Sequence, residues 1–142
     1  MKRIIVLVCP KGAGKSTIGQ LLEAQIGIPF VRVEPIYLRV RATLGASHPD
    51  LEREGFRAIL AHLEEALARH DIICFETTGA SQHTPWLLAE LGRSAEVLPV
   101  KVLAEPGQCV ERIHSRDAAI HIPVLDEAIE RINAVAIQVS LP

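Results

Sequence analysis

The stretch CPKGAGKST, residues 9–17, places two glycines, a lysine and two hydroxyls in one turn between two apolar segments. Residues 3–9 form a continuous apolar run that predicts a strand, and residues 15–26 carry Ile18 and Leu21 at helical spacing. The first N–H groups of a helix have no partner within it, and the positive end of the helix dipole lies beside them. Such a turn favours an anion, so the predicted chemistry is the binding of a phosphate chain.

Each position of this turn has a place in that chemistry. Gly12 and Gly14 carry no Cβ, so the backbone can come close to an anion. Lys15 is expected to lie along the β- and γ-phosphates, and the Ser16 hydroxyl to bind Mg²⁺. The other residues expected to contact the nucleotide are Lys11, Ala13 and Thr17. The match is to the Walker A pattern GxxxxGKS or GxxxxGKT, with Cys9 in place of its first glycine. The alternative is a turn that only joins a strand to a helix.

The rest of the chain alternates between strand-like and helix-like patterns. Apolar runs predict further strands at residues 30–33, 71–75 and 97–103. Amphipathic or capped stretches predict helices at residues 49–69, 85–91, 106–117 and 123–139, and residues 36–47 are interpreted as a short helix followed by a turn. This alternation predicts an α/β fold in one domain, residues 1–142, with a mostly parallel sheet between two layers of helices. In such three-layer α/β/α sandwiches the ligand lies beyond the carboxyl ends of the strands.

Two acidic residues follow strands of this predicted sheet. Glu76 ends an apolar run, where a carboxylate can hold Mg²⁺ directly or through water. Glu34 closes the neighbouring strand ahead of Pro35, where a carboxylate can orient or deprotonate the hydroxyl of an acceptor. We expect Glu34 to be the base or orienting group and Glu76 the metal-side group. Exchanged roles stay open, and so does a structural role in which either acid caps a turn or pairs with an arginine.

The phosphate loop, the acid after the second strand and the paired arginines of CVERIHSR, residues 109–116, resemble the P-loop kinases of small molecules and nucleotides. Shikimate- and gluconate-kinase-like proteins are the nearest in size. The resemblance implies the sheet order 2-3-1-4 and a lid at about residues 106–123. By position Arg112 and Arg116 look like the lid arginines that reach the phosphates, and four residues apart they share one helix face. The alternative for both arginines is that they form ion pairs with neighbouring acidic residues on the surface. No fifth strand of the family is found before the chain ends, so the chain is read as truncated or trimmed.

The resemblance also places the acceptor between the second strand and the long helix. Five arginines gather in this region: Arg32, Arg39, Arg41, Arg53 and Arg57. We expect the acceptor to be bound by Glu34, Arg39, Arg57, Thr78 and Gly79, the last two supplying hydroxyl and backbone donors. Pairing with a neighbouring glutamate is the alternative for any single arginine. The paired acids of shikimate kinases at the end of strand two are replaced by Arg32-Val33-Glu34, which argues against shikimate itself as the acceptor.

Composition narrows the class of protein. A length of 142 residues with 49% hydrophobic side chains suits one core, and a net charge of −2 gives no support for a nucleic-acid or membrane-surface partner. Cys9, Cys74 and Cys109 lie far apart without a CxxC pair, which favours a reducing compartment. The first apolar run is too short for a membrane span or a signal peptide. We therefore expect a cytoplasmic monomer or homodimer that acts on a small molecule.

The function predicted from these features is transfer of the γ-phosphoryl group of ATP to a small hydroxylated molecule with the help of Mg²⁺. Two other functions stay open. One is a nucleotide-binding ATPase or switch that acts on a protein partner, although no NKxD sequence for guanine recognition is present. The other is a non-catalytic nucleotide-binding module, which Cys9 keeps open. The sequence does not identify the acceptor.

Overall fold

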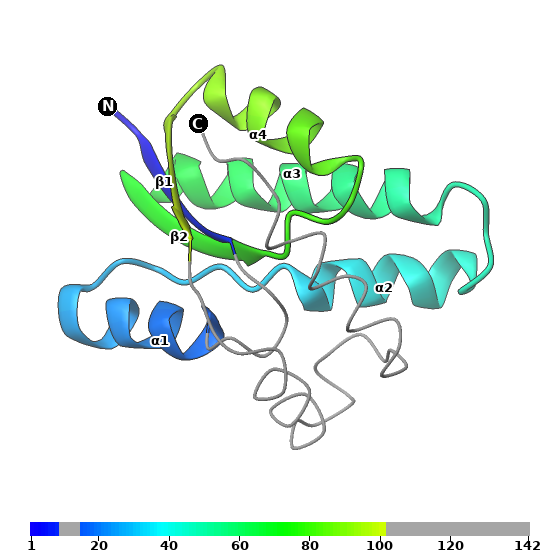
Figure 1. Ribbon diagram of the computed structural model, residues 1–142, viewed down its shortest axis with the longest axis horizontal. Coiled ribbons are helices and arrows are strands. Elements are labelled where there is room, and N and C mark those ends of the chain that lie inside the picture. Colours follow the sequence, from blue (N-terminus) through cyan, green and yellow to red (C-terminus); the bar gives the residue numbers. More distant parts are fainter. Residues whose placement is uncertain (9–14, 102–142) are drawn as a thin grey trace.

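The computed structural model describes residues 1–8 and 15–101, except for the side chains of residues 15–17 (Figure 1). Its elements in chain order are β1 (Arg3–Val8), α1 (Lys15–Ile26), α2 (Glu34–Leu44), α3 (Leu51–Arg69), β2 (Ile72–Thr77), α4 (Thr84–Gly92) and β3 (Glu96–Lys101). Strands and helices alternate as the sequence predicts. The end of the predicted strand at residues 97–103, the lid at 106–123 and the helices at 106–117 and 123–139 lie outside the described residues.

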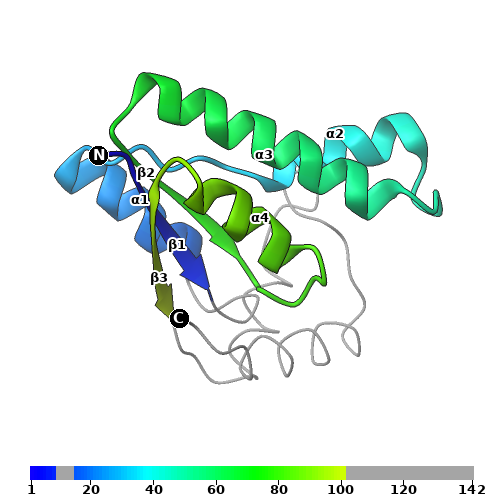
Figure 2. The ribbon, with the colours of Figure 1, turned by 90° about the horizontal axis from the view of Figure 1, so that it is seen from above.

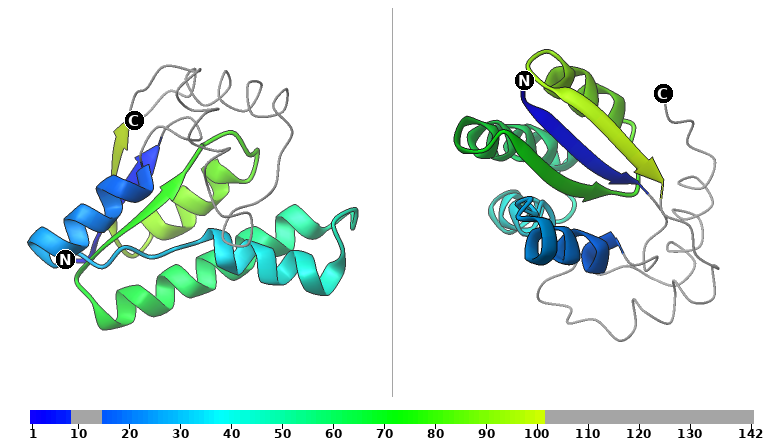
Figure 3. Two further views of the ribbon diagram at one scale, coloured as in Figure 1. Left: turned by 90° about the horizontal axis from the view of Figure 1, so that it is seen from below. Right: turned by 90° about the vertical axis from the view of Figure 1, so that its left-hand side faces the viewer.

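The three described strands form one parallel sheet in the order β2-β1-β3 (Figure 3, right). Val8, the last described residue of β1, pairs with Thr77 on one side and with Lys101 on the other, so the described parts of the three strands reach the same edge of the sheet. The chain therefore leaves β1 toward residues 9–14 at the common carboxyl edge of the sheet. This is where ligands of parallel α/β sheets lie.

The predicted second strand is present only as a single bridge. Phe30 pairs in parallel with Cys74 of β2, the N–H of Val31 donates to the Cys74 carbonyl at 2.7 Å, and the N–H of Cys74 donates to the Pro29 carbonyl at 2.9 Å. This segment lies on the outer side of β2, so the predicted order 2-3-1-4 is observed. The prediction that Glu34 closes a strand was wrong, since Glu34 is the first residue of α2.

Proline explains the early start of α2. Pro35 occupies the first turn of the helix, where a missing N–H costs no hydrogen bond and the fixed φ suits a helix. The helix ends at Leu44, and the N–H of Gly45 bonds to the Arg41 carbonyl at 2.8 Å. Gly27 ends α1 as predicted, with a φ of +77° that an L side chain rarely adopts. The backbone of residues 34–44 is therefore one regular helix whose faces can be assigned.

The two faces of the sheet bury different side chains. Ile4, Val6 and Phe75 join one core with Leu63 of α3 and Leu91 of α4. Figure 1 shows α3 and α4 on that side of the sheet and α1 on the other. Because side chains alternate along a strand, Leu7, Cys74 and Glu76 point to the α1 side. Leu7 and Cys74 are 1% and 0% exposed. The sheet is thus covered on both faces, and α2 lies beside α3 (Figure 2).

Candidate active site

The carboxyl edge of the sheet collects the chemistry that the structure describes. β1 reaches this edge at Val8, and α1 begins seven residues later at Lys15. The structure does not describe the residues between them, Lys11, Gly12, Ala13 and Gly14, or the side chains of Lys15, Ser16 and Thr17. Arg112 and Arg116 also lie outside the described residues. The roles assigned to these residues stay predictions.

Glu76 is the buried carboxylate of this edge. It stands opposite Leu7 in the register of β1 and β2, one residue before β2 ends, and only 9% of it is exposed. Its side chain shares the α1 side of the sheet with Cys74. Burial raises the pKa of the Cys74 thiol to about 11, with a further contribution from the negative charge of Glu76. A buried acid next to the carboxyl end of β1 lies where a metal-side group of a phosphate loop is expected.

The loop after β2 uses its own threonines to fix its shape. The N–H of Gly79 donates to Thr77 Oγ1 at 3.1 Å, the N–H of Ala80 donates to Thr78 Oγ1 at 3.3 Å, and Gly79 has a φ of +73°. The predicted backbone donor of Gly79 is therefore used within the loop. Each threonine hydroxyl that accepts such a bond still has its own hydrogen to donate. The donors that this loop offers a ligand are thus hydroxyls rather than the Gly79 amide.

A contact with α3 anchors the same loop. The hydroxyl of Ser81 donates to the carboxylate of Glu52, and Ser81 Oγ accepts the N–H of His83 at 3.0 Å. The His83 ring lies 5.7 Å from the ring of Phe56, one turn along α3 from Glu52. Sequence reasoning missed Glu52 and Ser81, because 29 positions separate them and neither belongs to a motif.

One face of α2 brings Glu34 and Arg41 into line. At 100° per residue, Arg41 lies about 20° from Glu34 around the helix, whereas Arg39 lies about 140° away. Tyr37, which lies between Glu34 and Arg41 in the sequence, packs on Gly55 of α3. A Cβ added to Gly55 would be 2.6 Å from the Tyr37 ring. Burial raises the pKa of Tyr37, the charge of Glu52 raises it further, and the charge of Arg41 lowers it. Arg41, Tyr37 and Glu52 are therefore close enough to interact electrostatically.

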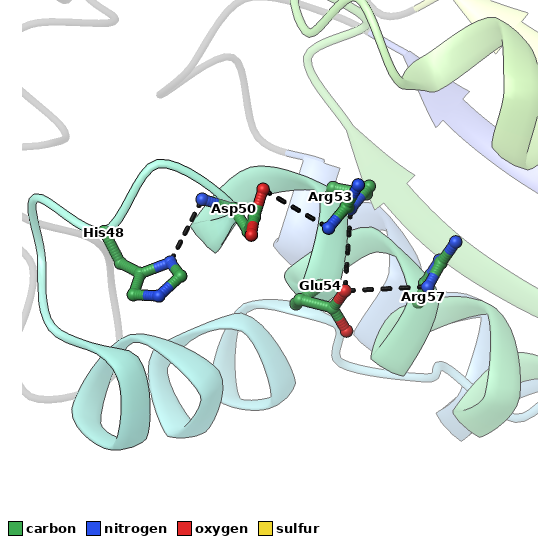
Figure 4. A network of polar contacts seen from close by, with 5 residues as sticks. All are labelled: His48, Asp50, Arg53, Glu54 and Arg57. Atoms are coloured by element: carbon green, nitrogen blue, oxygen red, sulfur yellow. Dashed lines mark hydrogen bonds and ion pairs between the residues drawn. The ribbon is translucent and has the colours of Figure 1, made fainter.

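Arg39 and Arg57, both predicted to bind the acceptor, line a groove between α2 and α3. Arg57 pairs with Glu54 at 3.6 Å, and Arg53 pairs with Asp50 at 3.2 Å and with Glu54 at 3.6 Å (Figure 4). These ion pairs are 38% to 61% exposed, and exposed pairs contribute little to stability. For Arg53 and Arg57 the structure thus shows the surface pairing that was the alternative. Arg39 does not share the Glu34 face of α2.

The described residues can hold Mg²⁺ only together with phosphate oxygens and water. They contain no group of three or more histidine, cysteine or acidic side chains placed to hold a metal ion. Mg²⁺ is commonly held by one or two carboxylates, with phosphate oxygens and water completing the octahedron. Among the described residues, the buried carboxylate of Glu76 suits the part of one such protein ligand. Among the same residues, no helix is long and apolar enough to cross a bilayer.

A parallel sheet covered by helices on both faces, with GAGKST following β1 and running into the first residues of α1, defines the class as an α/β fold of the P-loop type. A curated shikimate kinase from Halorhodospira halophila (strain DSM 244 / SL1) is 38% identical over 85 residues, which is 57% of this chain and 46% of that protein. The chain thus spans about half the length of this relative. No family model matches the chain.

Solved structures of kinases share the fold. A shikimate kinase from Acinetobacter baumannii in complex with shikimate matches 98% of this chain and 76% of its own, with 22% identity and a TM-score of 0.60. A gluconokinase from Sinorhizobium meliloti 1021 matches 93% of this chain and 73% of its own, with 18% identity and a TM-score of 0.60. The α/β P-loop fold is confirmed, and so is the predicted resemblance to shikimate- and gluconate-kinase-like proteins.

Proposed function

We propose that this chain is a kinase that transfers the γ-phosphoryl group of ATP to a small hydroxylated molecule with the help of Mg²⁺. The observation that carries the proposal is the position of Glu76. Its buried carboxylate lies on the α1 side of the sheet, opposite Leu7 and just before the carboxyl edge from which the GAGKST loop starts. The similarity to shikimate kinase and gluconokinase supports the same reaction class.

On the nucleotide side, the loop amides and Lys15 hold the phosphates, and Ser16 and Glu76 are the protein groups that hold Mg²⁺. The ion, when bound, neutralises charge on the transferring group. Lys11, Gly12, Ala13, Gly14 and Thr17 complete the contacts to the nucleotide. Arg112 and Arg116 add positive charge from a lid at about residues 106–123 of the single domain, 1–142. Phosphoryl transfer depends mainly on such positioning and charge neutralisation, which this set of residues can supply.

On the acceptor side, Glu34 orients or deprotonates the hydroxyl that attacks the phosphorus. It begins α2 just beyond the segment that pairs with β2. Arg41 shares its helix face and is the arginine we favour for an anionic group on the acceptor, with Arg57 at the groove between α2 and α3. The hydroxyl of Thr78 is the donor from the loop after β2, whose shape depends on the positive φ of Gly79.

The test is ADP release by the purified chain with ATP, Mg²⁺ and a panel of acceptors that includes shikimate, gluconate and simple polyols. We expect release to depend on one acceptor class and to be abolished in Lys15→Ala. Lys2→Ala is the matched control, because Lys2 forms a surface pair with Asp71 at the opposite edge of the sheet. Unchanged turnover in Lys15→Ala would refute the proposal, and hydrolysis that ignores every acceptor would favour the ATPase or switch.

Two further variants separate the roles of the carboxylates. Glu76→Gln is expected to raise the Mg²⁺ concentration needed for half-maximal rate, whereas Glu34→Gln is expected to lower kcat at saturating Mg²⁺ by about 10²-fold or more, as loss of a general base does. The opposite pattern would exchange the two assignments. A chain that binds no nucleotide although Lys15 is present would favour the non-catalytic module.

A further inference from the structure

A hollow lined by basic side chains lies away from the carboxyl edge of the sheet. It is a hollow of about 460 Å³ between the segment that precedes α2 and the C-terminal half of α3. Its wall includes Phe30, Arg32, Pro35, Arg39, His62 and Arg69. Because Arg69 ends α3 and only His70 and Asp71 separate it from β2, this hollow is beside the amino half of that strand. It is therefore separate from the region where β1 and β2 end.

The charged side chains that line this hollow are arginines, and one of them, Arg69, pairs with Glu65 at 3.7 Å. Three arginines and two histidines line it, and no described acidic residue does. Of the eight arginines in the described residues, five pair with a carboxylate: Arg3, Arg53, Arg57, Arg69 and Arg93. Arg32 and Arg39, which both line the hollow, form no ion pair with a described residue. Arg32 instead lies over the ring of Phe30, with its guanidinium carbon 5.7 Å from the ring centroid.

The wall behind these charges is buried and apolar. Val31, Ile36 and Ala66 are 9%, 7% and 6% exposed. The backbone of Val31 is fixed to β2 through Cys74, and Pro35 and Ile36 belong to the first turn of α2. Like charges that converge on one rigid hollow repel one another, and an anion between them removes that cost. Arginine also presents a planar fork of donors that matches carboxylate and phosphate oxygens.

We infer that this hollow, lined by Arg32, Arg39 and Arg69, binds a compact small molecule that carries two or more negative charges on phosphate or carboxylate groups. The volume is that of a site for a small ligand rather than a groove for a long polymer. The net charge of −2 also disfavours a nucleic-acid strand. Because Pro35 and Ile36 form part of its wall, a bound anion would brace the start of α2, the helix that Glu34 begins.

The inference is tested by calorimetric titration of the intact chain with pyrophosphate and, separately, with citrate at constant ionic strength. Because pyrophosphate can also enter a phosphate loop, the titrations are carried out with a saturating non-hydrolysable ATP analogue and Mg²⁺, and repeated in Lys15→Ala. We expect one equivalent of pyrophosphate or citrate to bind in both proteins. The probe that binds more tightly identifies the preferred group as phosphate or carboxylate.

Arg32→Gln and Arg39→Gln are each expected to weaken this binding about tenfold, since each removes a charge-assisted hydrogen bond. Arg93→Gln is the matched control, because Arg93 is an exposed arginine outside the hollow, and it should change binding less than about twofold. Both substituted arginines are exposed, so the circular dichroism and Tm of the variants should match those of the parent.

Two results would overturn the inference. One is failure of both probes to bind while the ATP analogue is present. The other is binding that Lys15→Ala abolishes and the Arg32→Gln/Arg39→Gln double variant leaves unchanged, which would assign the anion to the phosphate loop. The test does not depend on the proposed kinase reaction, because it measures binding and needs no turnover, although the hollow shares Arg39 and His62 with the groove between α2 and α3.

Discussion

Ser81 donates its hydroxyl hydrogen to the carboxylate of Glu52, and this bond joins the loop after β2 to the first turn of α3. The same loop holds Thr77 and Thr78, whose hydroxyls accept the N–H groups of Gly79 and Ala80. A part-buried serine thus connects the helix that packs against α2 with the loop that offers hydroxyl donors at the carboxyl edge.

Ser81→Ala should loosen this loop. We expect a loss of about 1 kcal/mol in the free energy of unfolding, the usual contribution of one hydrogen bond. If the proposed reaction is correct, the KM for the acceptor should rise several-fold while the KM for ATP changes little, because only the acceptor side loses its support. The control is Ser94→Ala, which substitutes an exposed serine after α4. Equal changes in both KM values would assign Ser81 a general structural role.

The sole tyrosine of the chain reports the charges around it. Because the charge of Glu52 raises the pKa of Tyr37 and that of Arg41 lowers it, Glu52→Gln should lower this pKa and Arg41→Gln should raise it. Ultraviolet titration of tyrosinate measures the value directly, since no second tyrosine contributes. Glu54→Gln, which removes an acid paired instead with Arg53 and Arg57, should leave it nearly constant. Opposite or absent shifts would contradict the geometry described for α2 and α3.

Gly55 makes room for the Tyr37 ring. An added Cβ would lie 2.6 Å from that ring, so Gly55→Ala should cost about 1–3 kcal/mol of stability despite the better helix propensity of alanine. Gly92→Ala is the matched control, because nothing lies within 4 Å of its added Cβ. Denaturant unfolding gives both values. In a Tyr37→Ala background Gly55→Ala should stabilise the protein by up to about 1 kcal/mol, and continued destabilisation there would exclude the ring as the cause.

The Cys74 thiol makes the free energy of unfolding depend on pH in the alkaline range. Its pKa is raised from 9.0 to about 11 in the folded chain, so between these values the unfolded state loses the thiol proton first. The unfolded state then binds fewer protons, and the free energy of unfolding falls as pH rises from about 9 to about 11, by about 2–3 kcal/mol in total. Below pH 9 this contribution is fully present.

The measurement compares urea unfolding of the parent with that of Cys74→Ala across this pH range. The difference between the two proteins isolates the thiol, because other groups that titrate at high pH are common to both. In a Cys9→Ser/Cys109→Ser background, Cys74 should also resist alkylation at pH 8 while the chain is folded, since it is 0% exposed. A parent and a variant with equal pH dependence would contradict the assigned pKa.

Local sequence signals predicted the order of the elements and the phosphate chemistry of residues 9–17. Continuous apolar runs predicted β1 and β2, helical spacing predicted α1 and α3, and Gly27 predicted the end of α1, because these signals act over a few neighbouring residues. GAGKST predicted phosphate chemistry on the same local basis. The one clear error, the strand that Glu34 was expected to close, arose because Pro35 can either end a strand or begin a helix.

Which side chains meet across the fold became known from the structure. It placed Glu76 on the α1 side of β2, joined Ser81 to Glu52 across 29 residues, and gave Arg41 rather than Arg39 the helix face of Glu34. It also gathered Arg32, Arg39 and Arg69 around one hollow. None of these relationships has a sequence signal, because each depends on the first residue of a helix or on two elements that become neighbours only when the sheet forms.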